Sequence, residues 1–184
     1  TIVVLGGSQG SQKMNDALLD ILPELLKSYQ VIHQTGRKNF ESVKARASLI
    51  LEKSDLAKRY HALAFLDEEE LRNASKVARL VIARAGGGSI FELAAWGLPA
   101  ILIPLSSAAQ DHQRENAYAY ARAGAAEVLE EENLSPHILL DRIQKLISDE
   151  ARRQKMAAAA KNFAKPEAAG KLAEEIIRLA LEHS

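Results

Sequence analysis

Short apolar runs alternate along the chain with stretches in which apolar residues recur every three or four positions. The runs are bounded by glycine, proline or polar residues, which is typical of buried strands. The stretches between them have the spacing of amphipathic helices, as at Met14, Leu18, Ile21, Leu22 and Leu25. Six runs are predicted as strands, at residues 2–5, 30–34, 61–65, 80–83, 100–103 and 126–129. This alternation predicts an α/β fold, a doubly wound, Rossmann-like parallel sheet of about six strands.

Capping residues mark several helix starts. Asp67 and Glu70 have the spacing of a capping box, and Ser135 followed by Pro136 is typical of an N-cap and a first helical residue. After Ser135 the pattern is helical throughout, and residues 150–184 are predicted as a helical tail. We expect residues 1–184 to form a single domain. Because Thr1 adjoins the first apolar run directly, we also expect this sequence to be an excised domain or a processed fragment.

Charge and cysteine content narrow the range of partners and chemistries. The 24 basic and 24 acidic residues balance, so the chain lacks the positive charge typical of nucleic-acid-binding proteins. No cysteine is present among the 184 residues, which excludes disulfides and thiolate chemistry. No apolar run approaches the ~20 residues that span a bilayer. We therefore expect a cytoplasmic domain without a nucleic-acid partner.

A glycine-rich turn follows the first predicted strand, from Gly6 to Gly10. Its G-x-S-x-G spacing matches the nucleophile elbow of α/β-hydrolases, with Ser8 as nucleophile, but no strands precede it and no acidic and histidine partners follow in a convincing order. It lacks the dinucleotide fingerprint G-x-G-x-x-G and the Gly-Lys-Ser/Thr of a Walker A loop. Two interpretations stay open: a tight turn that serves packing, and a turn that approaches a ligand.

A second turn, from Arg84 to Glu92, joins two apolar runs through three consecutive glycines, Gly86 to Gly88. Glycines let a ligand approach the backbone, and the free N–H groups at a helix start attract anions, so this turn suits a phosphate. Ser89 and Glu92 have capping-box spacing, with the helix opening at Ser89. Glu92 is equally placed to accept hydrogen bonds from two ribose hydroxyls, and spacing alone does not separate these roles.

The third turn follows Pro104 and is long and polar, from Ser106 to Asn116. Its amides and carboxylates suit a sugar, whose hydroxyls need donors and acceptors together. A solvated loop that leads into a helix start is the plainer interpretation, and His112 alone is more typical of a surface residue than of a catalytic base. No D-x-D or paired His/carboxylate motif occurs, so we expect neither a metal nor another cofactor.

Together these motifs resemble the MurG family of N-acetylglucosaminyltransferases. The resemblance rests on the Gly6–Gly10 turn, on residues 84–89 with Glu92, on the Trp96-Gly97-Leu98-Pro99 turn and on residues 111–117. It covers essentially the whole chain but only the C-terminal, donor-binding half of a two-domain GT-B enzyme. It implies inverting transfer of N-acetylglucosamine from UDP-N-acetylglucosamine to lipid I, which forms lipid II at the inner face of the cell membrane.

The resemblance also implies roles for individual residues toward UDP-N-acetylglucosamine. Ser8 and Gln9, with Gly10 in the same turn, lie beside the diphosphate and sugar, and Phe65 and Leu66 border the uracil. Gly88 and Ser89 present N–H groups to the diphosphate, Glu92 takes the ribose hydroxyls, Gln113 with His112 reads the sugar, and Arg84 supports the turn. The catalytic base, the acceptor site and the membrane contact are expected in an N-terminal domain that is missing here, so this chain alone is expected to be inactive.

Two rival functions share the fold and the donor. Half of a UDP-N-acetylglucosamine epimerase would carry catalytic carboxylates near the diphosphate, and Glu92 is the only good candidate. A UDP-sugar-binding subunit of a split glycosyltransferase would have a natural start just upstream of Thr1. The chain also departs from the family pattern: Ala85 stands where a small polar residue is expected, and Gly87 with Gly88 makes the turn more flexible than usual.

Overall fold

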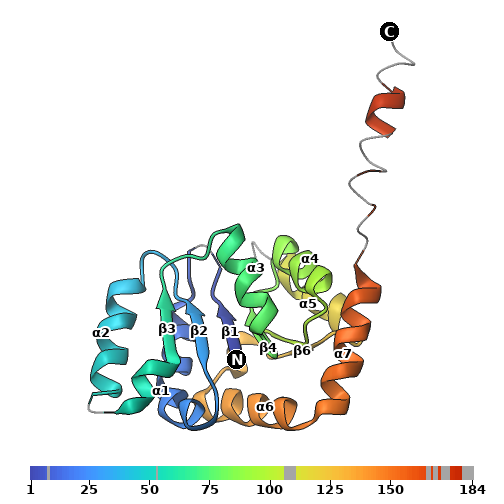
Figure 1. Ribbon diagram of the computed structural model, residues 1–184. Helices are drawn as coiled ribbons and strands as arrows, with labels where there is room; N and C mark the ends of the chain where they lie inside the picture. Colours follow the sequence, from blue (N-terminus) through green and yellow to red (C-terminus); the bar gives the residue numbers. More distant parts are fainter. Residues whose placement is uncertain are drawn as a thin grey trace.

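A computed structural model describes residues 1–7, 9–52, 54–105, 111–164, 167, 170 and 175–179. Its centre is a parallel sheet in the order β3-β2-β1-β4-β5-β6 (Figure 1). The strands are β1 (Ile2–Leu5), β2 (Val31–Gln34), β3 (Tyr60–Leu63), β4 (Leu80–Ala83), β5 (Ala100–Leu102) and β6 (Ala126–Val128). The predicted doubly wound α/β fold is confirmed. Each observed strand overlaps a predicted apolar run, and its first residue differs from the predicted one by at most one position.

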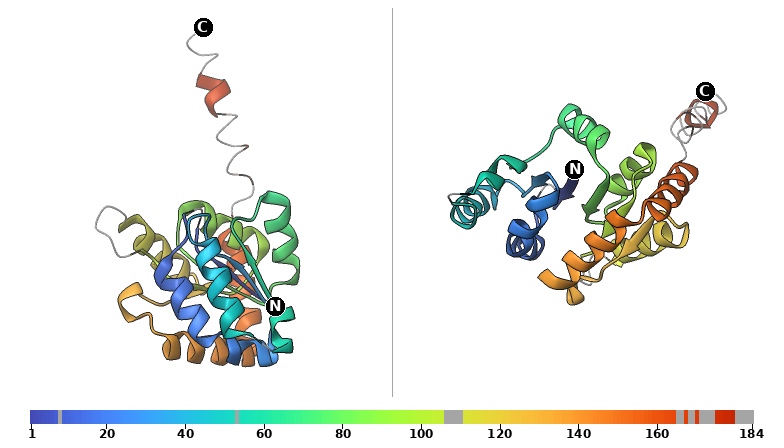
Figure 2. Two further views of the ribbon diagram at one scale, coloured as in Figure 1. Left: turned by 90° about the vertical axis from the view of Figure 1, so that its left-hand side faces the viewer. Right: turned by 60° about the horizontal axis from the view of Figure 1, so that its bottom comes forward.

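Helices cover both faces of the sheet, as Figure 2 shows from two further directions. The α-helices are α1 (Gln12–Ser28), α2 (Phe40–Ile50), α3 (Glu68–Val77), α4 (Gly87–Trp96), α5 (Asp111–Arg122), α6 (Pro136–Ser148) and α7 (Glu150–Phe163). Two short 3-10 helices are η1 (Asp55–Arg59) and η3 (Glu131–Asn133). Beyond α7, the described residues 175–179 are helical, and Ile176 and Ile177 among them are exposed.

Two apolar cores follow from the alternation of side chains along each strand. In β1, Ile2 and Val4 face the core built with α1, α2 and α6. Val3 and Leu5 face the opposite core, to which α3, α4, α5 and α7 contribute. Because β1, β4 and β5 are buried on both faces, their sequences are continuously apolar rather than alternating. This continuity is why strands were predictable from short runs.

Capping residues mark the starts of three helices, and the sequence analysis predicted two of them. Ser11 is the N-cap of α1 and its Oγ accepts from Met14 N–H at 3.3 Å. Asp67 and Glu70 form the predicted capping box of α3. Ser135 is the N-cap of α6, with Pro136 as its first residue.

The predicted start of α4 is wrong. The helix begins at Gly87 with Gly86 as N-cap, so Ser89 is its third residue and Glu92 its sixth. The capping-box interpretation of Ser89 and Glu92 fails, because that motif requires the carboxylate at the third helical position. The helix after Pro104 also begins earlier than its apolar pattern suggested, at Asp111, so the polar residues 111–116 form its first turns rather than a loop.

A chain of buried polar groups links α1 to β2 and β3. Asn15 Nδ2 donates to the Thr35 carbonyl at 3.1 Å, which turns Asn15 Oδ1 toward His33 Nε2 at 3.0 Å. His33 Nε2 therefore carries the ring hydrogen, and Nδ1, 2.8 Å from Tyr60 Oη, accepts from that hydroxyl. His33 is fully buried, and this burial lowers its pKa to about 3.

This buried histidine predicts a pH dependence of stability. The unfolded chain takes up a proton at His33 below about pH 6.5, whereas the folded chain does so only near pH 3, so stability falls as pH falls through that window. Between pH 7 and pH 5 we expect the free energy of unfolding to drop by about 2 kcal/mol from this group. Urea unfolding at both pH values should show a smaller drop in His33→Gln. His61→Gln, at an exposed position on β3, is the matched control. Its free energy of unfolding should drop between the two pH values as much as that of the unaltered protein.

Candidate functional site

The candidate site lies at the carboxyl edge of the sheet, where β1 and β4 are neighbours. The chain leaves β1 toward α1 on one face and leaves β4 toward α4 on the other. At such a point the two turns diverge and leave a crevice, which is the usual ligand site of doubly wound sheets. The Gly6–Gly10 turn and the Gly86–Gly88 turn flank this point, as their positions after β1 and β4 require.

The turn after β1 uses its glycines for backbone shape and for packing. Gly7 and Gly10 have positive φ angles of 82° and 75°, and Gly10 N–H donates to Gly7 O at 3.1 Å. A side chain at Gly10 would place its Cβ 2.2 Å from Thr35 O and 2.9 Å from Gly36 Cα. Gly10 therefore allows this turn to contact the turn after β2. The Gln9 side chain is exposed beside it, and Ser8 lies outside the described residues.

The turn after β4 is different, because nothing in the described chain requires its glycines. A Cβ added at Gly86, Gly87 or Gly88 would meet no atom within 4 Å, and none of the three has a positive φ. Ile90 N–H donates to Gly86 O at 3.0 Å, which leaves the N–H groups of Gly87, Gly88 and Ser89 without an acceptor in the described ranges. Three backbone donors at a helix N-terminus thus face open space.

Arg84 directly follows β4, and its side chain has three described polar partners on other segments of the chain. The residue is 9% exposed, and its Nη1 donates to Ile103 O at 3.0 Å at the end of β5. Its Nη2 donates to Ser11 Oγ at 2.6 Å and pairs with Glu131 Oε1. These contacts fit a residue that supports the turn, whereas a direct contact of Arg84 with the donor stays a prediction.

Glu92 follows the glycines by about one helical turn on α4. Its side chain is exposed overall, yet partial burial of the carboxyl group raises its pKa above the ordinary value. No described group donates a hydrogen bond to it. With the capping role excluded by the start of α4, the ribose interpretation is the remaining prediction for Glu92.

The start of α5 ties the third turn to the second. Gln113 Oε1 accepts from Leu105 N–H at 3.2 Å, and Asn116 Nδ2 donates to Ala85 O at 3.2 Å. Gln113 is half-buried, while the His112 side chain is 92% exposed and lies 3.8 Å from Glu115 Oε2. Residues 106–110, the centre of the predicted polar loop, lie outside the described residues. The sugar-reading role of Gln113 and His112 stays a prediction.

Phe65 and Leu66 lie beyond β3, on the opposite flank of the Gly6–Gly10 turn from α4. Phe65 is 39% exposed, and the Arg37 guanidinium lies 4.9 Å above its ring. Leu66 is buried, and its N–H donates to Gln34 Oε1 at 3.1 Å. A base placed here would meet the exposed ring of Phe65, while the Leu66 N–H is already engaged.

Two residues with clear structural contacts to the site escaped the sequence analysis. Ser11 directly follows the glycine turn, and its position before the helical pattern was a usable N-cap signal. Glu131 stands in a run of three glutamates, which sequence reasoning treats as a solvated surface.

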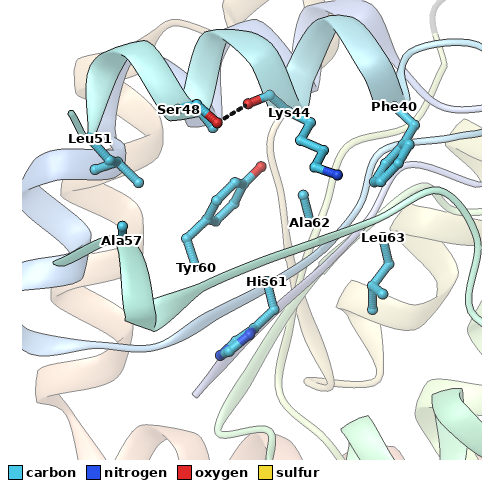
Figure 3. A pocket seen from close by; sticks show the side chains of 10 residues that line it. Phe40, Lys44, Ser48, Leu51, Ala57, Tyr60, His61, Ala62 and Leu63 are labelled. Carbon is cyan, nitrogen blue, oxygen red and sulfur yellow. Dashed lines mark hydrogen bonds between the residues drawn. The ribbon is translucent and has the colours of Figure 1, made fainter. Parts of the chain in front are cut away.

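A cavity of about 550 Å³ opens elsewhere, between α2 and the edge strand β3 (Figure 3). Lys44 and Phe40 extend into it from α2, and Tyr60 extends into it from β3. None of its lining residues belongs to the predicted donor site. The lining of this cavity is formed by α2, β3 and the residues between them.

The described residues contain no group of three or more His, Cys, Asp or Glu side chains that could hold a metal ion. No helix in the same ranges combines the length and apolar composition that crossing a bilayer requires.

Known proteins with similar sequences include N-acetylglucosamine transferases. A UDP-N-acetylglucosamine--N-acetylmuramyl-(pentapeptide) pyrophosphoryl-undecaprenol N-acetylglucosamine transferase from Natranaerobius thermophilus is 36% identical over 171 residues, covering 92% of this chain and 46% of that protein. MurG of Acinetobacter baumannii, a solved structure, has a TM-score of 0.79 at 26% identity, covering 96% of this chain and 49% of that one. The chain spans about half the length of the curated relatives it matches.

An epimerase is similar in fold alone. The UDP-GlcNAc 2-epimerase from Neisseria meningitidis has a TM-score of 0.67 at 12% identity, covering 96% of this chain and 43% of that one. The model of the glycosyltransferase family 28 C-terminal domain, by contrast, matches residues 1–172. The chain therefore belongs to glycosyltransferase family 28, and it corresponds to the C-terminal domain of that family.

Proposed function

We propose that this chain is the donor-binding domain of an inverting, metal-independent N-acetylglucosaminyltransferase. It would hold UDP-N-acetylglucosamine while the sugar is transferred to lipid I, which yields lipid II. The observation that carries this proposal is the open glycine turn at the start of α4. The relatives support it, because they are named as transferases of N-acetylglucosamine to an N-acetylmuramyl-(pentapeptide) pyrophosphoryl-undecaprenol acceptor.

The glycines of α4 suit a diphosphate on energetic grounds. A glycine inside a helix costs roughly 0.5–1 kcal/mol relative to alanine, and Gly87 and Gly88 are the first two residues of α4. Neither φ nor packing within the described chain demands glycine there. Close approach of a ligand to the backbone explains them, and the free N–H groups and helix dipole favour an anion at that point.

The same turn can act in the reaction as well as in binding. The acceptor C4 hydroxyl forms a bond to the anomeric carbon while the bond from that carbon to UDP breaks, and the hydroxyl proton passes to a base. Negative charge grows on the diphosphate as UDP leaves, and donors preorganised at the α4 N-terminus stabilise that charge without a metal ion. The base, the lipid I site and the membrane contact belong to a domain outside these 184 residues, so this chain alone binds donor but turns over poorly.

Alanine at Gly88 separates ligand binding from folding. Gly88→Ala should weaken UDP binding about tenfold or more, because the added methyl group occupies the space of the diphosphate. The free energy of unfolding should stay constant or rise by about 0.4–1 kcal/mol, since the φ of Gly88 suits alanine. Calorimetric titration with UDP and thermal unfolding check both. Gly170→Ala, another position with open surroundings, is the control and should leave UDP affinity unchanged. Equal UDP affinities of the unaltered chain, Gly88→Ala and Gly170→Ala would contradict the proposal.

Glu92→Ala should weaken UDP binding by about 1–3 kcal/mol, because charged hydrogen bonds to the ribose are lost. Titration with 2′-deoxy-UDP should show the matching loss in the unaltered protein and little further loss in the variant. The affinity of the unaltered protein should also fall as pH is lowered toward the raised pKa of Glu92, since the neutral carboxyl accepts more weakly. Equal binding of UDP by Glu92→Ala and the unaltered protein would remove Glu92 from the site.

Gln113 is tested by a pair of substitutions. Gln113→Glu keeps an oxygen that can accept from Leu105 N–H but loses the amide donors, whereas Gln113→Ala loses both. We expect each variant to weaken UDP-N-acetylglucosamine and to leave UDP nearly unchanged, because only the sugar needs the amide. Titration of both ligands decides the matter, and equal losses for the two ligands would refute the sugar-reading role.

A further inference from the structure

Glu131 is the one carboxylate in the described ranges that pairs with the arginine beneath both glycine turns. It begins η3, the short helix after β6, and lies 47 residues from Arg84 in sequence. The two side chains are 13% and 10% exposed, so the pair is almost removed from solvent. A second contact joins the same residue to α1, because Lys13 Nζ donates to the Glu131 carbonyl.

The guanidinium of Arg84 also bonds to residues that adjoin the first and third turns. Its Nη2 group donates to Ser11 Oγ, the N-cap of α1, and its Nη1 group donates to the carbonyl of Ile103 after β5. Arg84 itself directly follows β4 and precedes the open glycines. The Arg84 side chain therefore links the turn after β4, to which it belongs, with the residue after the first glycine turn and with the end of the strand that leads into the third turn.

Glu131 determines how that group is oriented. A guanidinium is a rigid, planar fork of donors, and a buried one is stable only with a charged or strongly accepting partner. The other two acceptors, a hydroxyl and a carbonyl, are neutral, so Glu131 is the only described carboxylate that compensates the charge of Arg84. Without Glu131, the guanidinium would rotate toward water, and its hydrogen bonds to Ser11 and Ile103 would break.

We propose that Glu131 is a positioning residue that, through Arg84 and Ser11, sets the distance between the two glycine turns. This inference rests on the proposed function for its consequence, because the two turns would hold the same diphosphate. Glu131 does not contact the donor. Removal of the Glu131 carboxylate moves the N–H groups of α4 away from the turn after β1. A ligand with more phosphate groups therefore loses more affinity.

The chain offers a matched control on β6, the strand that precedes η3. Glu127 in β6 is 12% exposed on its side chain and pairs with Arg142 at 2.9 Å and Arg152 at 2.8 Å. It holds α6 and α7 to the sheet, and no hydrogen bond or ion pair joins it to the described residues of the three turns. Glu127→Gln therefore removes a comparable buried charge without touching Arg84.

The binding arm compares Glu131→Gln, Glu131→Ala and Glu127→Gln by calorimetric titration with UDP and with uridine. We expect UDP to bind about tenfold more weakly to Glu131→Ala, the equivalent of one charge-assisted hydrogen bond. Glu131→Gln should lose less, since its amide oxygen still accepts from Arg84, and uridine should be unaffected in both. Equal losses for UDP and uridine, or equal UDP losses in the Glu131 and Glu127 variants, would overturn the positioning role.

A second arm needs no ligand and separates this inference from the proposed function. Backbone amide resonances of Gly7, Gly87 and Gly88 should shift in Glu131→Gln and in Ser11→Ala but not in Glu127→Gln. If the unaltered chain fails to bind UDP, the proposed function fails, and these resonances alone decide whether Glu131 sets the turns. Unchanged glycine resonances in Glu131→Gln would reject the inference even where UDP binds.

Discussion

The buried charge of Arg84 is the constraint on which the candidate site depends. A guanidinium so far from water must find acceptors, and it finds them on three segments that are distant in sequence and adjacent in the fold. Its partners are the N-cap of α1, the end of β5 and the glutamate that opens η3. Each lies at the carboxyl edge of the sheet, so one buried charge links three segments that adjoin the candidate site.

The two glycine turns serve different physical purposes, although they look alike in sequence. Gly10 is required by contact, since a Cβ there would meet Thr35 O at 2.2 Å. Gly86 to Gly88 are required by no contact in the described chain, and their backbone faces open space. The first turn is thus part of the scaffold, and it brings the turn after β2 against the site. The second turn leaves its N–H groups available to an anion.

Particular residues show where sequence reasoning succeeded and where it failed. Strands such as β1 and β4 were found because both of their faces are buried, which makes the runs continuously apolar. The start of α4 was misplaced because Ser89 and Glu92 carry capping-box spacing, while the helix begins two residues earlier at glycines that no propensity argument favours. Glu131 was missed because its partner is 47 residues away, and nothing in a run of glutamates marks which one is buried.

The sequence by itself determined the strand and helix order, the parallel sheet and the existence of two glycine turns after strands. These features follow from local periodicity and turn chemistry, which act over a few residues. Only the tertiary structure decided that the turns follow neighbouring strands, β1 and β4, that Arg84 is buried and that Glu131 pairs with it. Burial and charge pairing depend on segments that are distant in the sequence and adjacent in the fold. A local sequence pattern therefore does not indicate which charged side chains become buried.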